Sequence, residues 1–318
     1  MSEFTITDNF PSNEIEFDQR FKDDLDCYDY LFCAKWPDGF ICYKCGNQKY
    51  WLSSRALYIC DKCEHQHSLT AGTIMHGTKK PLIYWFKAMW WFTTRKSGIN
   101  SINLKDLLGL SSYGTAWTWL QKLRSCTIRK DREQLSGQVE VDEFYIGGRR
   151  PGKRGRGAEG KYPVVAAVEK HGRTLGRIRL QILDNCSSDE LIPFVNHNLH
   201  KDSHVLTDSW TGYNALESEG YGHFKIVKEK ADDPSNLLPG VHIVASLLKR
   251  LMAGTFQGRF SKKHLQRTLD EFVFRFNRRT SKSGGKKFMR IMQQATATSP
   301  ITYEQIAQGL PVGYGCAN

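Results

Sequence analysis

The sequence predicts an α/β domain in the second half of the chain, preceded by a small cysteine-rich domain and a helical region. Near the N-terminus the cysteines occur as two Cys-x2-Cys pairs, and beyond residue 136 strand-like runs alternate with a helical segment. Three strands, a helix and a further strand indicate a mixed sheet covered by helices. At 318 residues the chain has room for about two domains of roughly 100 to 200 residues each.

Composition indicates an ordinary globular protein that attracts polyanions. Hydrophobic residues make up 40% and charged residues 25% of the chain. No apolar run approaches the roughly 20 residues that span a bilayer, and the polar start "MSEFTITDNFPSNE" lacks a signal region. We therefore expect a cytoplasmic protein without a membrane partner. The formal net charge of +12 favours nucleic acid as the partner.

Four of the nine cysteines have the spacing of a zinc ribbon. After an acidic and aromatic lead segment, Cys42-x2-Cys45 is followed after fourteen residues by Cys60-x2-Cys63. Two such pairs close a tetrahedral four-thiolate Zn²⁺ site, which has no open position and therefore folds a subdomain rather than catalyses. A redox pair is the alternative for a single Cys-x2-Cys, and His65 or His67 is an alternative ligand.

The segment after Pro81 has helical periodicity, and part of it suggests a helix-turn-helix. Two short apolar-periodic segments flank Gly109, with Ser111 or Ser112 as the cap of the second. Basic residues at its end, Lys122 and Arg124, are predicted to contact DNA. A small helical bundle is the alternative.

The second half contains four predicted strands and a basic loop. The strand-like runs are 138–146, 162–169, 174–183 and 203–207, with a helix at 187–200. The loop "GGRRPGKRGRGAEGK" follows the first strand and suits contacts with DNA phosphates, although a solvated charge run is the usual explanation for such a stretch. Its predicted DNA-binding residues are Arg149, Arg150, Lys153, Arg154 and Arg156.

Two aspartates are placed where they can share a metal ion. Asp142 lies on the first strand and Asp208 directly follows the fourth, and these strands can be neighbours. Paired carboxylates repel unless a hard cation such as Mg²⁺ lies between them. Strand alternation puts Glu140 on the face of Asp142, as a supporting or a solvated group, and Glu143 on the other face, paired with a basic residue.

A third ligand is expected from the amphipathic segment "VHIVASLLKRLMAG". His242 and Lys249 are seven residues apart and project from the same side, away from the apolar face. A surface or capping histidine is the alternative, and acids just upstream compete for the role: Glu229, Asp232 and Asp233. A last helix from Ser261 to Asn277 presents Lys262 and Lys263 for DNA contacts.

These motifs, in this order, resemble the ISXO2-like insertion-sequence transposases of the DDE superfamily. The resemblance covers about residues 35–280 and rests on seven motifs: the two cysteine pairs, "SLTAGTIMHGTKKPL", "GQVEVDEFYIGG", "LTDSWTGY", "HIVASLLKR" and "SKKHLQRTLDEFVFRFNRR". It implies a zinc ribbon, a helix-turn-helix and a ribonuclease H-like domain. By that resemblance Asp142 and Asp208 match the first two catalytic aspartates, and His242 with Lys249 matches the third position and its lysine.

The chain departs from the superfamily at that third position, where glutamate is usual. An imidazole is a poorer partner for Mg²⁺ than a carboxylate and suits Mn²⁺ better. The resemblance implies metal-dependent cleavage of double-stranded element ends, strand transfer into target DNA, and a homodimer or larger oligomer that holds two ends. A DNA-binding regulator with a degenerate catalytic domain and a metal-dependent nuclease are the alternatives.

The predicted organisation has five parts. They are a lead segment (1–35), a zinc ribbon (36–78), a helical DNA-binding region (79–132), a ribonuclease H-like α/β domain (136–280) and a basic C-terminal tail (281–318).

Overall fold

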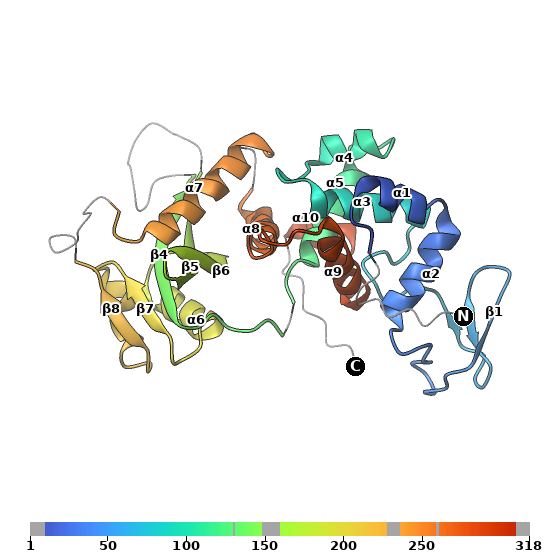
Figure 1. The fold of residues 1–318 in the computed structure, drawn as a ribbon, viewed down its shortest axis with the longest axis horizontal. Coiled ribbons are helices and arrows are strands. Elements are labelled where there is room, and N and C mark those ends of the chain that lie inside the picture. Colours follow the sequence, from blue (N-terminus) through green and yellow to red (C-terminus); the bar gives the residue numbers. More distant parts are fainter. Residues whose placement is uncertain (1–9, 130, 148–159, 228–235, 259–260, 310–318) are drawn as a thin grey trace. The chain divides into compact units, whose positions relative to one another are not determined.

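The protein is described by a computed structural model that divides into two compact units (Figure 1). Residues 10–129, 131–147, 160–227, 236–258 and 261–309 are described. The helical unit comprises residues 1–129 together with 280–318, and the sheet unit comprises residues 130–279. The C-terminal segment therefore groups with the N-terminal part of the chain and not with the sheet.

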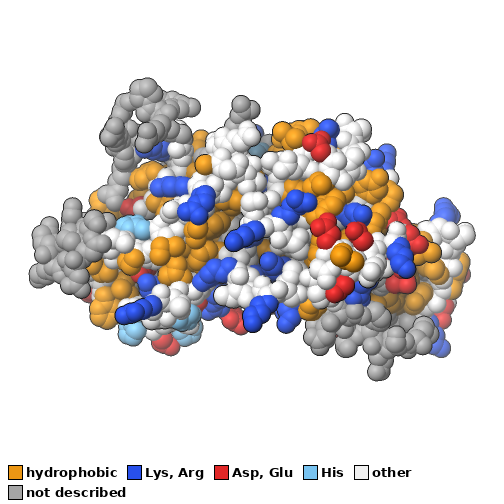
Figure 2. Space-filling view, turned by 45° about the horizontal axis from the view of Figure 1, so that its top comes forward, with side chains coloured by type: hydrophobic (Ala, Val, Ile, Leu, Met, Phe, Trp, Pro, Cys, Tyr) orange, Lys and Arg blue, Asp and Glu red, His pale blue; other side chains and the backbone are white. Residues whose placement is uncertain are grey.

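Basic side chains are spread over the surface. Figure 2 shows Lys and Arg side chains across much of the viewed face, interspersed with hydrophobic and acidic ones. Among the described residues, no helix has the length and apolarity needed to cross a membrane. Such a surface agrees with the net charge of +12 and with an affinity for polyanions.

The helical unit packs its helices around an aromatic core. Its elements are α1 (Glu14–Arg20), α2 (Asp24–Lys35), α3 (Leu82–Thr94), α4 (Ser101–Leu107), α5 (Tyr113–Ser125), α9 (Gly284–Ala297), α10 (Tyr303–Gln308) and the strands β1 (Tyr50–Leu52), β2 (Tyr58–Cys60) and β3 (Gln66–His67). The ring of Phe288 on α9 lies 5.6 to 5.9 Å from five other aromatic rings, those of Phe17, Phe21, Tyr30, Phe86 and Trp90.

The expected basic tail contains two helices, one of which completes this core. On α9, Phe288, Ile291, Met292 and Ala295 are buried and follow helical spacing. This helix packs on α2 and α3. The segment predicted as a basic tail therefore contains α9 and α10.

The two helices expected as a helix-turn-helix are present, but the second one is largely covered. Gly109 joins α4 to α5 in the left-handed region, at φ 59°. Beyond Tyr113, every residue of α5 is buried or half-buried, and Trp119 stacks on Trp85 of α3 with ring centroids 4.0 Å apart. Arg124, which the sequence predicted to contact DNA, is only 4% exposed.

The sheet unit is a mixed five-stranded sheet with helices on both faces. Its elements are β4 (Gln138–Ile146), β5 (Tyr162–His171), β6 (Thr174–Ile182), α6 (Ser188–Asn198), β7 (His204–Thr207), η1 (Thr211–Leu216), β8 (Gly222–Lys225), α7 (Pro239–Gly254) and α8 (Lys262–Phe276). The strand order is β6-β5-β4-β7-β8, antiparallel from β6 to β4 and parallel from β4 to β8. The α/β prediction is confirmed; β8 was not predicted.

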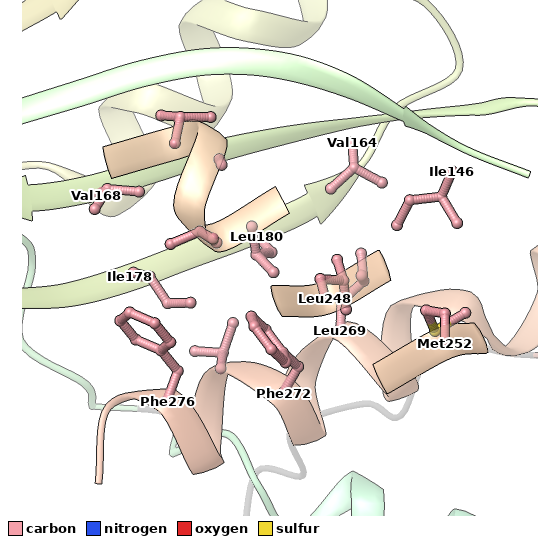
Figure 3. Packing of buried hydrophobic residues seen from close by; sticks show 14 of the residues in the cluster. Ile146, Val164, Val168, Ile178, Leu180, Leu248, Met252, Leu269, Phe272 and Phe276 are labelled. Atoms are coloured by element: carbon pink, nitrogen blue, oxygen red, sulfur yellow. The ribbon is translucent and has the colours of Figure 1, made fainter. Parts of the chain in front are cut away.

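Strand alternation divides the core between the two faces of the sheet. Even-numbered residues of β5, such as Val164 and Val168, pack with α7 and α8, including Leu248 and Phe272 (Figure 3). Odd-numbered residues such as Val165 pack on the other side with α6 and η1. Since β5 is buried on both faces, its sequence is a continuous apolar run.

Candidate functional site

The four cysteines of the two pairs converge in the helical unit. The Sγ atoms of Cys42 and Cys63 are 3.6 Å apart, those of Cys45 and Cys60 are 3.5 Å apart, and all four lie within 4.8 Å of one another. Four thiolates around Zn²⁺ at about 2.3 Å would lie roughly 3.8 Å from each other. The residues therefore fit a structural zinc ion.

Two equivalent turns present these sulfurs. The N–H of Gly46 donates to the carbonyl of Cys42 at 2.8 Å, and the N–H of Glu64 donates to that of Cys60 at 2.9 Å. Gly46 and Glu64 both have positive φ, 70° and 56°. Each Cys-x2-Cys pair is thus held by the same local backbone geometry, which the spacing alone predicts.

The neighbouring histidines support the cluster without entering it. Nε2 of His67 lies 3.3 Å from Sγ of Cys42, and His65 bonds the hydroxyl of Tyr43. Among the described residues, the compact ligand group contains only the cysteines. A histidine ligand is therefore not needed to complete it.

In the sheet unit, Asp142 comes from β4, and Asp208 is the residue that follows the neighbouring strand β7. The parallel pairing of β4 with β7 matches Gln138 with His204 and Glu140 with Leu206. Asp142 and Asp208 each follow this last pair by two residues. Asp142 lies in the middle of β4, on the strand face of Glu140 and Phe144 that α7 covers, and Asp208 directly follows the end of β7.

Local hydrogen bonds hold both carboxylates. Oδ1 of Asp142 accepts from the N–H of Glu143 at 2.8 Å, and Oδ1 of Asp208 accepts from the N–H of Trp210 at 2.9 Å. Both side chains are half-buried. Each carboxylate thus has an oriented oxygen and partial access to solvent.

A buried tyrosine shares the electrostatic environment of these acids. Tyr213 on η1 is fully buried, and its hydroxyl donates to Oε2 of Glu143 at 3.0 Å. Burial raises the pKa of Tyr213 well above its ordinary value, and the charges of Glu143, Asp142 and Asp208 raise it further. Glu143 therefore bonds this tyrosine, which sequence reasoning left out of the site.

Helix α7 lies along the face of β4 that carries Asp142. At its start the N–H of Val241 donates to Oε2 of Glu140 at 3.1 Å, and further along Nζ of Lys249 lies 5.6 Å from the ring centroid of Phe144. Glu140, Asp142 and Phe144 alternate onto one face of the strand. The helix that carries His242 and Lys249 therefore passes over the position of Asp142.

The predicted third ligand is not gathered with the two aspartates. His242 is exposed, and its Nδ1 lies 2.5 Å from Oδ1 of Asn236. Among the described residues, no group of three or more His, Asp or Glu ligand atoms lies within 4.8 Å. The competing acids Glu229, Asp232 and Asp233 lie outside the described residues.

A basic cavity opens in the helical unit. It has a volume of about 470 Å³ and is lined by the segment 76–80, the first half of α5 and Tyr303 of α10. Its basic residues are His76, Lys79, Lys80 and Lys122, and no Asp or Glu is among the described residues that line it. Burial lowers the pKa of Lys122. Lys122 thus faces this cavity and not an open helix surface.

The other predicted DNA contacts are scattered. Lys262 and Lys263 are exposed at the start of α8, and Lys262 pairs with Asp184. Arg149, Arg150, Lys153, Arg154 and Arg156 lie outside the described residues.

Glu140 is the residue whose role sequence reasoning left open. It is 3% exposed, its Oε1 lies 3.1 Å from Nζ of Lys170, and its other oxygen binds α7. Its position two residues before Asp142, on the same strand face, was the available signal. Its partners were not predictable, because they come from β5 and from a helix one hundred residues later.

Comparisons with known proteins match both units. The ISXO2-like transposase domain model matches residues 134–277, and the transposase zinc-ribbon domain model matches residues 22–66. A protein from Halobacterium salinarum, described as an uncharacterized protein in transposable element ISH50, is 26% identical over 216 residues, which cover 58% of this chain and 67% of the relative. The zinc-ribbon match begins within the predicted lead segment and includes α2.

Proposed function

We propose that this chain is a transposase of the ISXO2-like family, whose transposase and zinc-ribbon domain models match residues 134–277 and 22–66, and that it cuts the ends of an insertion sequence and joins them to target DNA. The observation that carries this proposal is the parallel pairing of β4 with β7, because Asp142 and Asp208 each follow the last pair of this register by two residues. We take the surrounding five-stranded sheet to be a ribonuclease H-like catalytic domain.

The chemistry of the pair suits a divalent cation. Asp142 and Asp208 would hold Mg²⁺ or Mn²⁺ through carboxylate oxygens, the ligands that hard cations prefer. A metal bound there would supply Lewis-acid stabilisation of the phosphoryl oxygens and activation of an attacking hydroxyl. The side chains themselves position the cation, and the hydrogen bonds from Glu143 and Trp210 N–H keep one oxygen of each carboxylate oriented.

We assign the third position to His242, with Lys249 as a phosphate-binding group beside it. The support is that α7 passes over the strand face of Asp142, anchored at Glu140 and at Phe144. A neutral imidazole favours Mn²⁺ over Mg²⁺. The positive charge of Lys249 suits the phosphate of a DNA strand lying across this face.

Double-stranded DNA would also contact basic residues outside the acidic pair. The cavity lined by Lys79, Lys80 and Lys122 suits a backbone phosphate because its described lining contains four basic residues and no acid. Exposed Lys262 and Lys263 and the five basic residues of the 148–159 segment are further candidates. Because two element ends are joined, we expect a homodimer or larger oligomer.

The test is cleavage and strand transfer by the full chain on DNA carrying the element's terminal repeats, with Mg²⁺ or Mn²⁺. Asp142→Asn and Asp208→Asn should each lower the rate on the order of 10³-fold, since a bound metal contributes several kcal/mol and about 1.4 kcal/mol is tenfold in rate. Binding of the same DNA should remain. The matched control is Asp202→Asn, an exposed aspartate ahead of β7.

Three outcomes would contradict the proposal in different ways. Full activity of Asp142→Asn would remove the paired acids from the mechanism. Specific binding of end DNA without cleavage by the wild type would identify a regulator. Cleavage of the ends without joining to a second DNA would identify a metal-dependent nuclease.

A further inference from the structure

Glu140 occupies a place that a helix cap normally takes. The first N–H groups of a helix lack partners within the helix, and a polar side chain just before the helix usually accepts from them. At α7 the N-cap residue is Leu238, which makes no side-chain cap bond, and Pro239 has no N–H. The acceptor comes instead from β4, where Oε2 of Glu140 receives the N–H of Val241 at 3.1 Å.

The surrounding residues are shaped for this contact. A Cβ added at Gly240 would lie 2.7 Å from Oε2 of Glu140 and 3.1 Å from Cδ2 of Leu175, so only glycine lets the helix start this close to the strand. The second oxygen of Glu140 is paired with Nζ of Lys170 at 3.1 Å, and side-chain exposures of 4% and 15% show that both groups are removed from solvent. Both carboxylate oxygens of Glu140 therefore have a partner within the fold.

The contact joins the two elements of the proposed metal site. Glu140 is two residues before Asp142 on the same face of β4. Val241 directly precedes His242, whose own N–H donates to the carbonyl of Leu238 at 3.1 Å and so belongs to the same first turn. A displacement of Glu140 would therefore move His242 relative to Asp142.

We propose that Glu140 is a positioning residue, which fixes the first turn of α7, and with it the backbone of His242, against the strand that carries Asp142. It does not itself bind the metal, because its oxygens hold Val241 N–H and Lys170. This inference rests on the proposed function. It also explains why Glu140 is buried two residues before Asp142. Its carboxylate connects β4 to α7 and is not a further metal ligand.

A purely structural role must be separated from positioning, and Glu169 on β5 provides the matched control. Like Glu140 it is 3% exposed, accepts from a backbone N–H, that of Ser136 at 3.0 Å, and pairs with a cation, Arg177 at 2.7 Å. These partners lie just before β4 and on β6, so the bonds of Glu169 tie strands together and not the start of α7. Substitution of either glutamate should lower the thermal midpoint of unfolding. Only substitution of Glu140 should change the position of His242 relative to Asp142.

The experiment measures Mn²⁺ binding to the full chain by electron paramagnetic resonance, alongside kcat and KM for end cleavage. Glu140→Ala should weaken Mn²⁺ binding and lower kcat by roughly 10- to 100-fold, as for other groups that orient a metal ligand. KM for DNA should be unchanged. Glu140→Gln keeps an oxygen that can accept from Val241 N–H and should recover part of the loss. Gly240→Ala, which keeps Glu140 in the sequence but adds a Cβ 2.7 Å from its Oε2, should displace the carboxylate and reproduce the weaker Mn²⁺ binding.

Mn²⁺ binding by Glu140→Ala and Gly240→Ala equal to that of Glu169→Ala would overturn the inference. Asp142→Asn separates this failure from a failure of the proposed function. If Asp142→Asn is inactive but Glu140→Ala behaves like Glu169→Ala, only the positioning role is lost. If Asp142→Asn cleaves normally, the proposed function itself fails. Should Glu140→Ala not fold, Glu140→Gln and Gly240→Ala decide the question by the same Mn²⁺ measurement.

Discussion

The cysteine cluster and the paired aspartates are two sites built in opposite ways. The cysteines lie within residues 42–63, and two similar turns close the cluster with backbone hydrogen bonds four residues apart. Asp142 and Asp208 are 66 residues apart in the chain, and only the parallel pairing of β4 with β7 makes their segments neighbours. A locally encoded site is complete once its turns form, whereas a site made by strand register depends on the whole sheet.

The surroundings of the two sites differ accordingly. In the ribbon, β2 is buried, but the strand β1 leaves Tyr50, Trp51 and Leu52 between 40% and 57% exposed. Around the aspartates, β4 and β5 are covered by cores on both faces. We expect the ribbon to depend on its metal and the sheet to depend on its packing.

Removal of zinc should produce the largest effect and is the strongest attempt to break this comparison. A chelator, or Cys60→Ser, should unfold β1 to β3, because structural zinc contributes on the order of 10 kcal/mol to the folding of such small domains. The measurement is hydrogen exchange of the ribbon amides together with the zinc content. Cys33→Ser, which changes a thiol outside the cluster, is the control.

The sheet unit should keep its protected amides under the same treatment. Exchange that increases equally in β1 to β3 and in β4 to β7 after zinc removal would show that the two sites are not independent. A ribbon that remains protected without zinc would show that its turns suffice.

Substitution of lysines that line the basic cavity should have a smaller effect. This third site is assembled from segments that are distant in sequence. Lys79→Gln, Lys80→Gln and Lys122→Gln should each weaken DNA binding and reduce the slope of log affinity against log salt by about 0.9 for each DNA phosphate that the side chain neutralises. The exposed Lys96, which does not line the cavity, provides the control Lys96→Gln. Salt slopes equal to that of Lys96→Gln would remove the cavity from the DNA path.

The smallest effect is expected from a change in pH. It tests how much a buried charge contributes to the stability of the sheet unit. Burial raises the pKa of Glu169, but hydrogen bonds from Arg177 and from the N–H of Ser136 outweigh it and hold the pKa below its ordinary value. A carboxylate with a lowered pKa stabilises the fold above its ordinary pKa and loses that contribution as the pH falls through the lowered value.

Thermal unfolding between pH 7 and pH 3 measures this contribution. The wild type should lose stability more steeply on the acid side than Glu169→Gln, which carries no titrating group at that position. Parallel curves for the two proteins would mean that Arg177 does not stabilise the charged form of Glu169.

Much of the fold could be predicted from the sequence because periodicity and spacing are local signals. The predicted strands 138–146, 174–183 and 203–207 differ from β4, β6 and β7 by at most one residue at each end. The sequence did not reveal how deeply some basic segments are buried. Arg124 is a charged residue, yet it is covered in α5. Helix α9 has a buried apolar stripe, although the segment was predicted only as a basic tail.

By itself the sequence predicted the cysteine cluster and the strands β4 to β7, since each depends on residue type and on spacing along one segment. Only the tertiary structure decided that β4 pairs with β7, that Glu140 accepts from the start of α7 and that Tyr213 bonds Glu143. The physical reason is that these relations arise from sheet register and helix packing. Both are set by burial of apolar surface between segments far apart in the chain.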